Sequence, residues 1–405
     1  MGDVDFKSYY TESEVVELLQ RLVAIPSHRD AAGREAAVGD FIYDYCAALG
    51  LSCEKHAVEG DRCNIHVRLR GSGTGRTLLL NGHMDTVPPY DMVIDPFGGV
   101  CRDGCVWGRG ANDMKGALAS MITALAAIKR SGLKLKGDVL LTAVVGEESE
   151  SDGTEAFVIS GGTADGAIVG EPSGYGYAIG HRGLETLEIR VKGTTMHSGQ
   201  ALKGTNAIRM MNRLIERIER DLFPRIIDRS NPYMGSGLMN YGRIFGGDQV
   251  CTVAGDCTLQ LDRRYIFGET VDSVIAEYQE IIDQLHREDP AFCATITRMP
   301  NSRMKHLAHA PLMTDPEEEI VKDTVAVLRE HLGREPELST KRGWTDAGVL
   351  SSFGRIPTIV CGPGELANSH TKDEHISIGQ LCDFVSIYAK IAVKFCGIET
   401  APDEK

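Results

Sequence analysis

The chain has 405 residues, a mass of 44.0 kDa, 42% hydrophobic residues and a formal net charge of −14. A chain of this length can bury one or two large cores, which excludes a small scaffold held together by disulfide bonds. The acidic balance, with no run of Lys and Arg, argues against a nucleic-acid partner. The eleven cysteines are scattered and contain no Cys-x-x-Cys pair, which indicates free thiols in a reducing compartment.

The beginning of the sequence, "MGDVDFKSYYTESEVV", is acidic and lacks the apolar segment of a signal peptide. No stretch approaches the roughly 18 continuous apolar residues of a membrane span. We therefore expect a cytoplasmic protein with no membrane partner.

The first part of the chain alternates between helical and strand patterns. A capping-box pattern from Thr11 to Glu14 predicts a first helix, and "EAAVGDFIYDYCAALG" predicts a second that ends at Gly50. Short apolar runs then alternate with a helical pattern in the order "TLLL", "KGALASMITALAAIKR", "DVLLTAVV" and "GAIVG". This alternation predicts an α/β layer with a mostly parallel sheet.

From about residue 184 the pattern changes to strands with one solvated face. In "LETLEIRVKG", apolar and charged residues alternate. The elements that follow give the order β-α-β-β-α-β, which predicts a ferredoxin-like domain. Past residue 300 the α/β pattern returns, with the helix "EEEIVKDTVAVLREHL", the strand "IPTIVCG" and a closing helix. We therefore expect a larger α/β domain formed by residues 1–183 and 299–405, interrupted by an inserted domain of residues 184–298.

Acidic and histidine residues follow the predicted strands of the larger domain. Ligand sites in open α/β sheets lie beyond the carboxyl ends of the strands, so these side chains are expected to gather at one edge. They are His83 and Asp85 after "TLLLNG", Glu147 and Glu148 after "TAVVG", Glu171 after "GAIVG", His370 after "IVCGPGELANS", and Asp113 at the start of a helix.

Each of these residues alone has a plain structural explanation. A single histidine can be a hydrogen-bonded loop residue, Asp113 can cap its helix, and Glu147 and Glu148 can be solvated. Together, so many carboxylates are unfavourable unless a cation offsets their charge. Two histidines and three carboxylates suit a pair of Zn²⁺ ions that share one carboxylate, which is a hydrolase arrangement.

Six motifs carry a resemblance to a known family: "GHMDTVP", "GRGANDMKGA", "GEESES", "GEPS", "GTTMHSG" and "NSHTKDEH". In this order the chain resembles, from about residue 15 to 395, the M20-type zinc metallopeptidase and deacylase family. That family includes acetylornithine deacetylase, succinyl-diaminopimelate desuccinylase, aminoacylase-1 and glutamate carboxypeptidases. The resemblance implies a zinc-peptidase-like α/β catalytic domain with an inserted ferredoxin-like domain that serves as lid and dimerisation domain.

The resemblance also implies a role for each residue of the group. Water bound between two Zn²⁺ ions, or Co²⁺ or Mn²⁺ in their place, would lose a proton to a carboxylate base and attack an amide carbonyl. The implied roles are Asp113 as bridging ligand, His83 and Glu171 as ligands of one zinc, Glu148 and His370 as ligands of the other, Glu147 as general base, and Asp85 as the acceptor that orients the His83 ring.

Three further residues receive roles from the same resemblance. His197 would come from the partner subunit of a homodimer and stabilise the oxyanion of the reaction. Arg264 would meet the substrate carboxylate, and Gly364 would let the backbone approach the ligand. From the residues alone, His197 can equally be a loop histidine and Arg264 a surface arginine of a strand. His306 and His309 are expected to be solvated.

The substrate is less well specified, because the chain departs from the family pattern. It has "CTVA" where relatives often have Asn-Val-Val-Pro, and Thr345 to Gly348 where desuccinylases have Ser-Asp-Gly-Arg. We expect deacylation of a small-molecule N-acyl-L-amino acid, as in acetylornithine deacetylases. The alternatives are a metallo-carboxypeptidase or dipeptidase that acts on short peptides and, from a different class, a catalytically silent metal-binding relative.

Overall fold

The computed structural model describes residues 4–300, 304–340 and 343–399, which form two compact units. The first unit comprises Met1–Ile179, Met313–Ser339 and Thr345–Lys405. The second comprises Gly180–Leu312 and Thr340–Trp344. In the part of the chain that is described, no helix is long and apolar enough to cross a membrane.

The first unit is built on a six-stranded sheet in the order β1-β2-β6-β3-β7-β16. Four neighbouring strands, β6, β3, β7 and β16, are parallel, and β1 and β2 add an antiparallel hairpin at one edge. The central strands β3 and β6 are buried at every residue, as expected for parallel strands covered on both faces. The sheet strands are β1 (Ser52–Glu59), β2 (Arg62–Leu69), β3 (Leu78–His83), β6 (Val139–Val144), β7 (Gly166–Val169) and β16 (Thr358–Val360).

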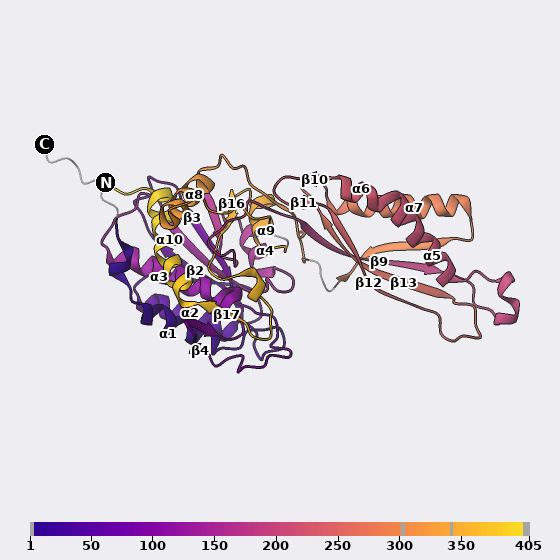
Figure 1. The fold of residues 1–405 in the computed structure, drawn as a ribbon, viewed down its shortest axis with the longest axis horizontal. Helices are drawn as coiled ribbons and strands as arrows, with labels where there is room; N and C mark the ends of the chain where they lie inside the picture. Colours follow the sequence, from indigo (N-terminus) through magenta and orange to yellow (C-terminus); the bar gives the residue numbers. More distant parts are fainter. Residues whose placement is uncertain (1–3, 301–303, 341–342, 400–405) are drawn as a thin grey trace. The chain divides into compact units, whose positions relative to one another are not determined.

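Helices pack against this sheet and against one another. α2 lies on β1 and β2, α8 and α9 lie on β7 and β16, and α3 packs on β3 and β6 and on α10 (Figure 1). α3 is buried along nearly its whole length, because it lies between the sheet and α10. The helices are α1 (Glu12–Val23), α2 (Ala36–Ala48), α3 (Gly116–Arg130), α4 (Asp152–Ile159), α8 (Glu319–Leu332), α9 (Ala347–Ser352) and α10 (Ile378–Cys396).

The carboxyl ends of the four parallel strands meet at one edge of the sheet, which is where the sequence placed its histidine and acidic residues. A small three-stranded sheet of β4 (Val100–Arg102), β5 (Cys105–Trp107) and β17 (His375–Ser377) joins the loop before Asp113 to the segment after His370. Two segments that are far apart in the sequence are therefore held side by side.

The second unit has a four-stranded antiparallel sheet in the order β12-β13-β9-β14. The order along the chain is β-α-β-β-α-β, as predicted, and the two long helices share one core with the buried faces of the strands. The elements are β9 (Gly183–Lys192), α5 (Ala207–Arg217), α6 (Phe223–Asp228), β12 (Leu238–Gly246), β13 (Asp256–Tyr265), α7 (Val271–Glu288) and β14 (Cys293–Arg298).

The second unit is larger than the predicted inserted domain of residues 184–298. It begins at Gly180 because β8 (Gly180–His181) pairs with β15 (Leu312–Met313), and the returning chain pairs at His309 with Leu184. Trp344 also belongs to it, since its indole N–H donates to the carbonyl oxygen of Ala310 at 2.8 Å. These pairings follow from tertiary contacts that the hydrophobic pattern does not show.

The expectation that His309 is solvated was wrong. Its side chain is only 2% exposed and meets the Trp344 ring edge-on, with ring centroids 4.6 Å apart. Burial, together with the positive charges of Arg298 and Arg264, lowers the pKa of His309 to about 4.

This low pKa predicts a loss of stability in acid. The unfolded chain takes up a proton on His309 below about pH 6.5, whereas the folded chain resists protonation down to about pH 4. Above pH 6.5 His309 is neutral in both states and does not reduce the free energy of unfolding. As the pH falls to 4, protonation of His309 in the unfolded chain lowers that free energy by ~3 kcal/mol. Denaturant unfolding at pH 7 and pH 4 should show a smaller difference for His309→Gln than for the wild type, with the exposed His306→Gln as matched control. Equal differences in all three proteins would contradict this assignment.

Candidate metal centre

His83 is the last residue of the buried strand β3, which fixes the direction of its ring. Its Nε2 atom lies 3.2 Å from Oδ1 of Asp113 and 3.6 Å from Oε1 of Glu171, which follows the neighbouring strand β7. All three side chains are buried. They form one group of donor atoms that could hold a metal ion.

A second group of donors shares Asp113 with the first. Nε2 of His370 lies 2.8 Å from Oε1 of Glu148 and 3.5 Å from Oδ2 of Asp113. Asp113 lies in a short irregular turn, η2 (Ala111–Lys115), with an extended backbone, and the peptide bond that follows it is cis. One oxygen of the Asp113 carboxylate lies near His83 and the other near His370, as a ligand shared by two ions would require.

Asp85 connects His83 to the loop after β6. The nearest acceptor to Nδ1 of His83 is the backbone carbonyl oxygen of Asp85 at 2.9 Å, and the Asp85 carboxylate lies 3.5 Å away. That carboxylate accepts hydrogen bonds from the backbone N–H groups of Glu147 and Glu148, at 3.1 and 2.9 Å. The same residue thus orients the histidine and positions two acidic residues.

The acidic side chains lie so close together that the negative charge of each makes ionisation of the others less favourable. Burial, and then the neighbouring charge of Glu171, raise the pKa of Glu147 well above its usual value, and burial raises the pKa of Glu148 to about 7. The hydrogen bond to Glu148 raises the pKa of His370 to about 9. Divalent cations would offset this crowding of negative charge, so the donor set fits a pair of metal ions.

Two buried residues that the sequence did not single out support the Asp113 turn. The carboxylate of Glu374 accepts hydrogen bonds from the backbone N–H groups of Asn112 and Asp113, both at 3.0 Å, and from the Arg109 guanidinium at 2.5 Å. Glu374 lies four residues after His370, so it links the segments that carry the two ligands. No local pattern marks these residues, because their role depends on a contact across more than 250 positions.

We expect Glu374→Gln to weaken the binding of divalent ions about 10- to 100-fold, since supporting hydrogen bonds of this kind contribute that much to metal affinity. The amide retains the shape of the side chain but loses its charge toward Arg109 and the Asp113 turn. Calorimetric titration of metal-free protein with Zn²⁺ would measure the change, with the exposed neighbour substitution Asp373→Asn as control. An unchanged affinity of Glu374→Gln for Zn²⁺ would show that Glu374 does not support the metal-binding turn.

The remaining predicted residues lie in different places. Gly364 belongs to the first unit, has a φ of +95°, and lies so close to Asn112 that a Cβ atom there would meet the amide oxygen at 2.3 Å. His197 and Arg264 belong to the second unit. Nδ1 of His197 accepts a hydrogen bond from the Gly199 N–H at 3.1 Å, and Nε of Arg264 donates to Asp262 at 3.0 Å.

Known proteins resemble this chain in sequence and in fold. The chain is 28% identical to the N-formyl-4-amino-5-aminomethyl-2-methylpyrimidine deformylase of Halalkalibacterium halodurans, over 96% of both chains. It is 31% identical to the acetylornithine deacetylase of Proteus mirabilis, over 95% of this chain and 98% of that one. Its fold is similar to that of the aminopeptidase PepT from Bacillus cereus, with a TM-score of 0.78, 21% identity, and coverage of 96% of this chain and 99% of that chain. The family model "Peptidase family M20/M25/M40" matches residues 79–394. The chain therefore belongs to peptidase family M20/M25/M40, whose members hydrolyse amide bonds.

Proposed function

We propose that this protein is a deacylase that uses a pair of divalent ions, in the first place Zn²⁺, to hydrolyse the amide bond of an N-acyl-L-amino acid. The observation that carries the proposal is the pair of donor groups that share Asp113, with Glu147 beside them. A mixed set of imidazole and carboxylate donors suits Zn²⁺, and also Co²⁺ or Mn²⁺, better than Mg²⁺, which prefers oxygen ligands alone.

In this proposal His83 and Glu171 bind one ion, Glu148 and His370 bind the other, and Asp113 binds both. When bound, the ions lower the pKa of a water molecule and polarise the amide carbonyl. Glu147, whose nearest carboxylate oxygen lies 4.0 Å from Nε2 of His83, takes a proton from the attacking water and returns it to the leaving amine.

A deacylase is favoured over a carboxypeptidase or dipeptidase by two relatives that are similar to this chain over nearly its whole length. The deformylase and the deacetylase share 28% and 31% of their residues with this chain over nearly the whole length, and both names describe removal of a short acyl group. The similarity to the aminopeptidase is at 21% identity and concerns the fold.

Release of primary amine from a substrate panel tests the proposal. Zinc-loaded protein would be assayed with N-acetyl, N-formyl and N-succinyl amino acids and with dipeptides. We expect release from the N-acyl amino acids. Cleavage of dipeptides alone would support the peptidase, and no release from any compound would support a silent metal-binding protein.

The hydrogen bonding of the His197 ring supports the proposed role of this residue as a donor to the oxyanion. Because Nδ1 accepts from the Gly199 N–H, the neutral ring carries its proton on Nε2. His197 is exposed, so this N–H is available to a ligand. We propose that it acts in the active site of a second copy of the chain, and that Arg264 assists in binding the substrate carboxylate.

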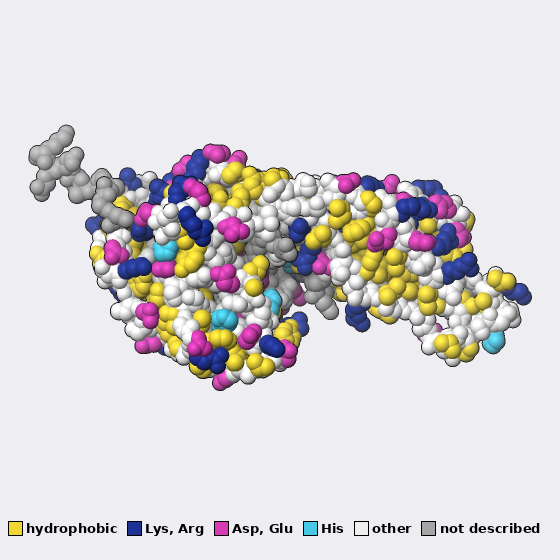
Figure 2. Space-filling view, viewed as in Figure 1, with side chains coloured by type: hydrophobic (Ala, Val, Ile, Leu, Met, Phe, Trp, Pro, Cys, Tyr) yellow, Lys and Arg dark blue, Asp and Glu magenta, His cyan; other side chains and the backbone are white. Residues whose placement is uncertain are grey.

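The edge strand β12 supports a homodimer formed through the second unit. It is the outer strand of its sheet, and Leu238, Ile244 and Phe245 on it are exposed. Figure 2 shows apolar side chains gathered on the surface of this unit. An exposed apolar edge strand is unfavourable in a monomer and is suited to pairing with a second copy.

We expect a dimer in light scattering, and we expect Ile244→Asp to shift it to a monomer. A charge on the outer strand would be desolvated at the interface, whereas it remains hydrated in the monomer. An equivalent charge at the exposed Ile159, in α4 of the first unit, serves as control. A wild-type monomer, or a dimer that Ile244→Asp leaves intact, would contradict the proposal.

A further inference from the structure

The two histidines of the metal centre are held in different ways. His83 ends the buried strand β3, its ring is 1% exposed, and its Nδ1 atom faces the backbone carbonyl oxygen of Asp85. The ring of His370 is 47% exposed and comes from the turn that follows the short helix η6 (Leu366–Asn368). The direction of the His370 ring therefore depends on the backbone conformation of its loop.

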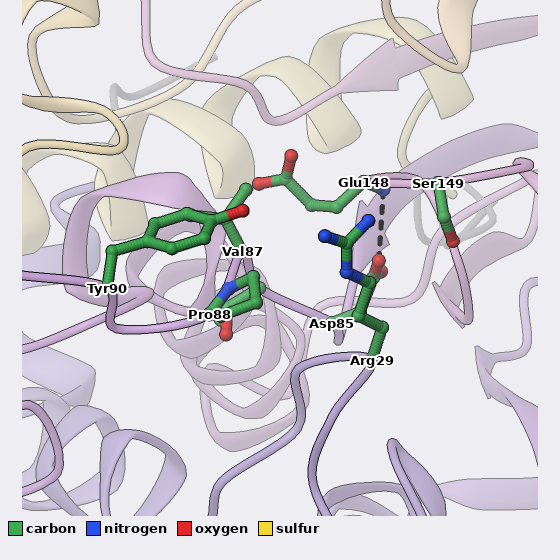
Figure 3. A pocket seen from close by; sticks show the side chains of 8 residues that line it. Arg29, Asp85, Val87, Pro88, Tyr90, Glu148 and Ser149 are labelled. Carbon is green, nitrogen blue, oxygen red and sulfur yellow. Dashed lines mark hydrogen bonds between the residues drawn. The ribbon is translucent and has the colours of Figure 1, made fainter. Parts of the chain in front are cut away.

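The backbone of His370 has a conformation that needs support. Its φ is +62°, a left-handed value that is uncommon for residues other than glycine. Such a conformation persists where the surrounding contacts hold it. Glu148, which shares a donor group with His370, is held through its own backbone. Its N–H donates to the Asp85 carboxylate at 2.9 Å, and its side chain extends away from this bond (Figure 3). The conformation of the His370 loop thus decides whether this donor group is complete.

Asn112 connects the His370 loop to the turn that carries Asp113. Its side chain is fully buried. Its amide oxygen accepts a hydrogen bond from the Glu365 N–H at 3.1 Å, and its amide nitrogen donates to the Glu365 carbonyl oxygen at 3.0 Å. The same nitrogen donates to the hydroxyl of Ser369 at 3.1 Å. The amide therefore pairs with the backbone of the loop as a neighbouring strand would, and it also holds the residue next to His370.

The surroundings of Asn112 are built for this contact. Gly364 lies directly against it, with a φ of +95°, and a Cβ atom at this position would collide with the Asn112 amide oxygen. The glycine therefore allows the amide to reach the loop. From the other side, Gln380 of α10 accepts from the Gly364 N–H at 2.9 Å and donates to the Glu365 carboxylate at 2.7 Å. The start of the loop is thus held from two sides, and Asn112 extends this support to Ser369.

Asn112 differs from Glu374 in what its side chain supports. The Glu374 carboxylate accepts from the backbone N–H groups of Asn112 and Asp113, and so holds the Asp113 turn itself. The hydrogen bonds of the Asn112 side chain go to the other segment, which carries His370. Removal of this side chain leaves the backbone bonds to Glu374 in place. The His370 loop would then lose support, whereas the Asp113 turn would keep it.

We propose that Asn112 is a positioning residue that sets the affinity of one donor group, formed by Asp113, Glu148 and His370, for its divalent ion. It does so by holding the loop in the conformation that presents the His370 ring to Glu148 and Asp113. The proposal rests on the proposed two-ion function and goes beyond it, because it makes the affinities of the two sites separately adjustable. A change at position 112 acts on one ion and leaves the ion at His83 and Glu171 unaffected.

Calorimetric titration of metal-free protein with Zn²⁺ tests this role. We expect Asn112→Ala to weaken the binding of one ion about 10- to 100-fold, as is usual for the loss of a residue that orients a ligand, and to leave the other ion at the wild-type affinity. Ser369→Ala removes one of the three hydrogen bonds and should weaken the same ion by a smaller factor. Asn212→Ala, at an exposed position of α5, is the matched control.

A double variant identifies the site that is affected. In His370→Ala protein the remaining ion is bound by His83, Glu171 and Asp113, so the addition of Asn112→Ala should leave its affinity unchanged. A further loss in the double variant, or equal weakening of both ions in Asn112→Ala, would overturn the proposal, because Asn112 would then act on the Asp113 turn or on the whole unit. Unchanged binding of both ions in Asn112→Ala would overturn it as well.

The binding measurement does not depend on turnover, so the two proposals can fail separately. Selective weakening of one ion by Asn112→Ala, in a protein that hydrolyses no N-acyl amino acid, would reject the deacylase and leave the role of Asn112 intact. Hydrolysis of N-acyl amino acids by the wild type, without a selective effect of Asn112→Ala on one ion, would reject the role of Asn112 and leave the deacylase.

Discussion

Glu147→Gln is expected to lower kcat about a thousandfold while two metal ions remain bound. Glu147 lies beside both donor groups that share Asp113, and with His83 and Glu148 it forms a further group of possible ligands, so the metal content of this variant distinguishes a base from a ligand. Glutamine has nearly the same shape and does not accept the proton of the attacking water, and general base catalysis contributes on this scale. The bonds that position this loop run from Asp85 to the backbone N–H groups of Glu147 and Glu148, so the substitution leaves them in place.

Turnover and metal content would be measured together on the same preparation. The exposed neighbour Glu150 provides the matched control, since Glu150→Gln makes the same chemical change in the same loop. Loss of metal from Glu147→Gln would make this residue a ligand instead of a base. Retained turnover would remove it from the chemistry altogether.

Asp113→Asn is expected to abolish the binding of both ions, whereas His370→Ala should abolish the binding of one. One Asp113 oxygen lies 3.2 Å from Nε2 of His83, and the other lies 3.5 Å from Nε2 of His370. An amide retains the shape of the side chain but lacks the negative charge that two cations would share. His370 belongs to only one of the two donor groups that share Asp113, so its removal leaves the other group complete.

Metal analysis after dialysis distinguishes these outcomes. The expected content is two ions per chain in the wild type, one in His370→Ala and none in Asp113→Asn. Two ions in Asp113→Asn would show that Asp113 does not bridge. Circular dichroism of each variant would establish that the loss of metal does not reflect an unfolded chain.

The sequence predicted the mostly parallel sheet because its central strands carry a strong local signal. β3 begins with three consecutive leucines and β6 is apolar except for Thr142, and the residues that follow these strands must lie at the carboxyl edge of the sheet. The edge hairpin of β1 and β2 was not predicted, because β1 is mostly exposed and its residues "SCEKHAVE" carry no clear alternation. Strand β1 owes its conformation to pairing with β2 more than to its own pattern.

The ligands of the metal centre could be predicted where the residue type and its position after a strand identified them. His83 follows a buried strand, and the structure brings it within 3.6 Å of Glu171 from the next strand of the sheet. Glu374 and Arg109 gave no such signal, since an acidic or basic residue in a loop is usually solvated. Their importance depends on the backbone groups and side chains that they contact after folding.

We propose that this chain hydrolyses N-acyl amino acids by means of bound divalent ions. The most direct measurement is the rate of N-acetyl amino acid hydrolysis by metal-free protein as Zn²⁺ is added back, followed in parallel with Glu147→Gln. We expect no turnover without metal, recovery of wild-type turnover as the two sites fill, and no recovery of turnover in Glu147→Gln. Hydrolysis at the full rate by the metal-free protein, or a fully loaded wild type that hydrolyses no N-acyl amino acid, would contradict it.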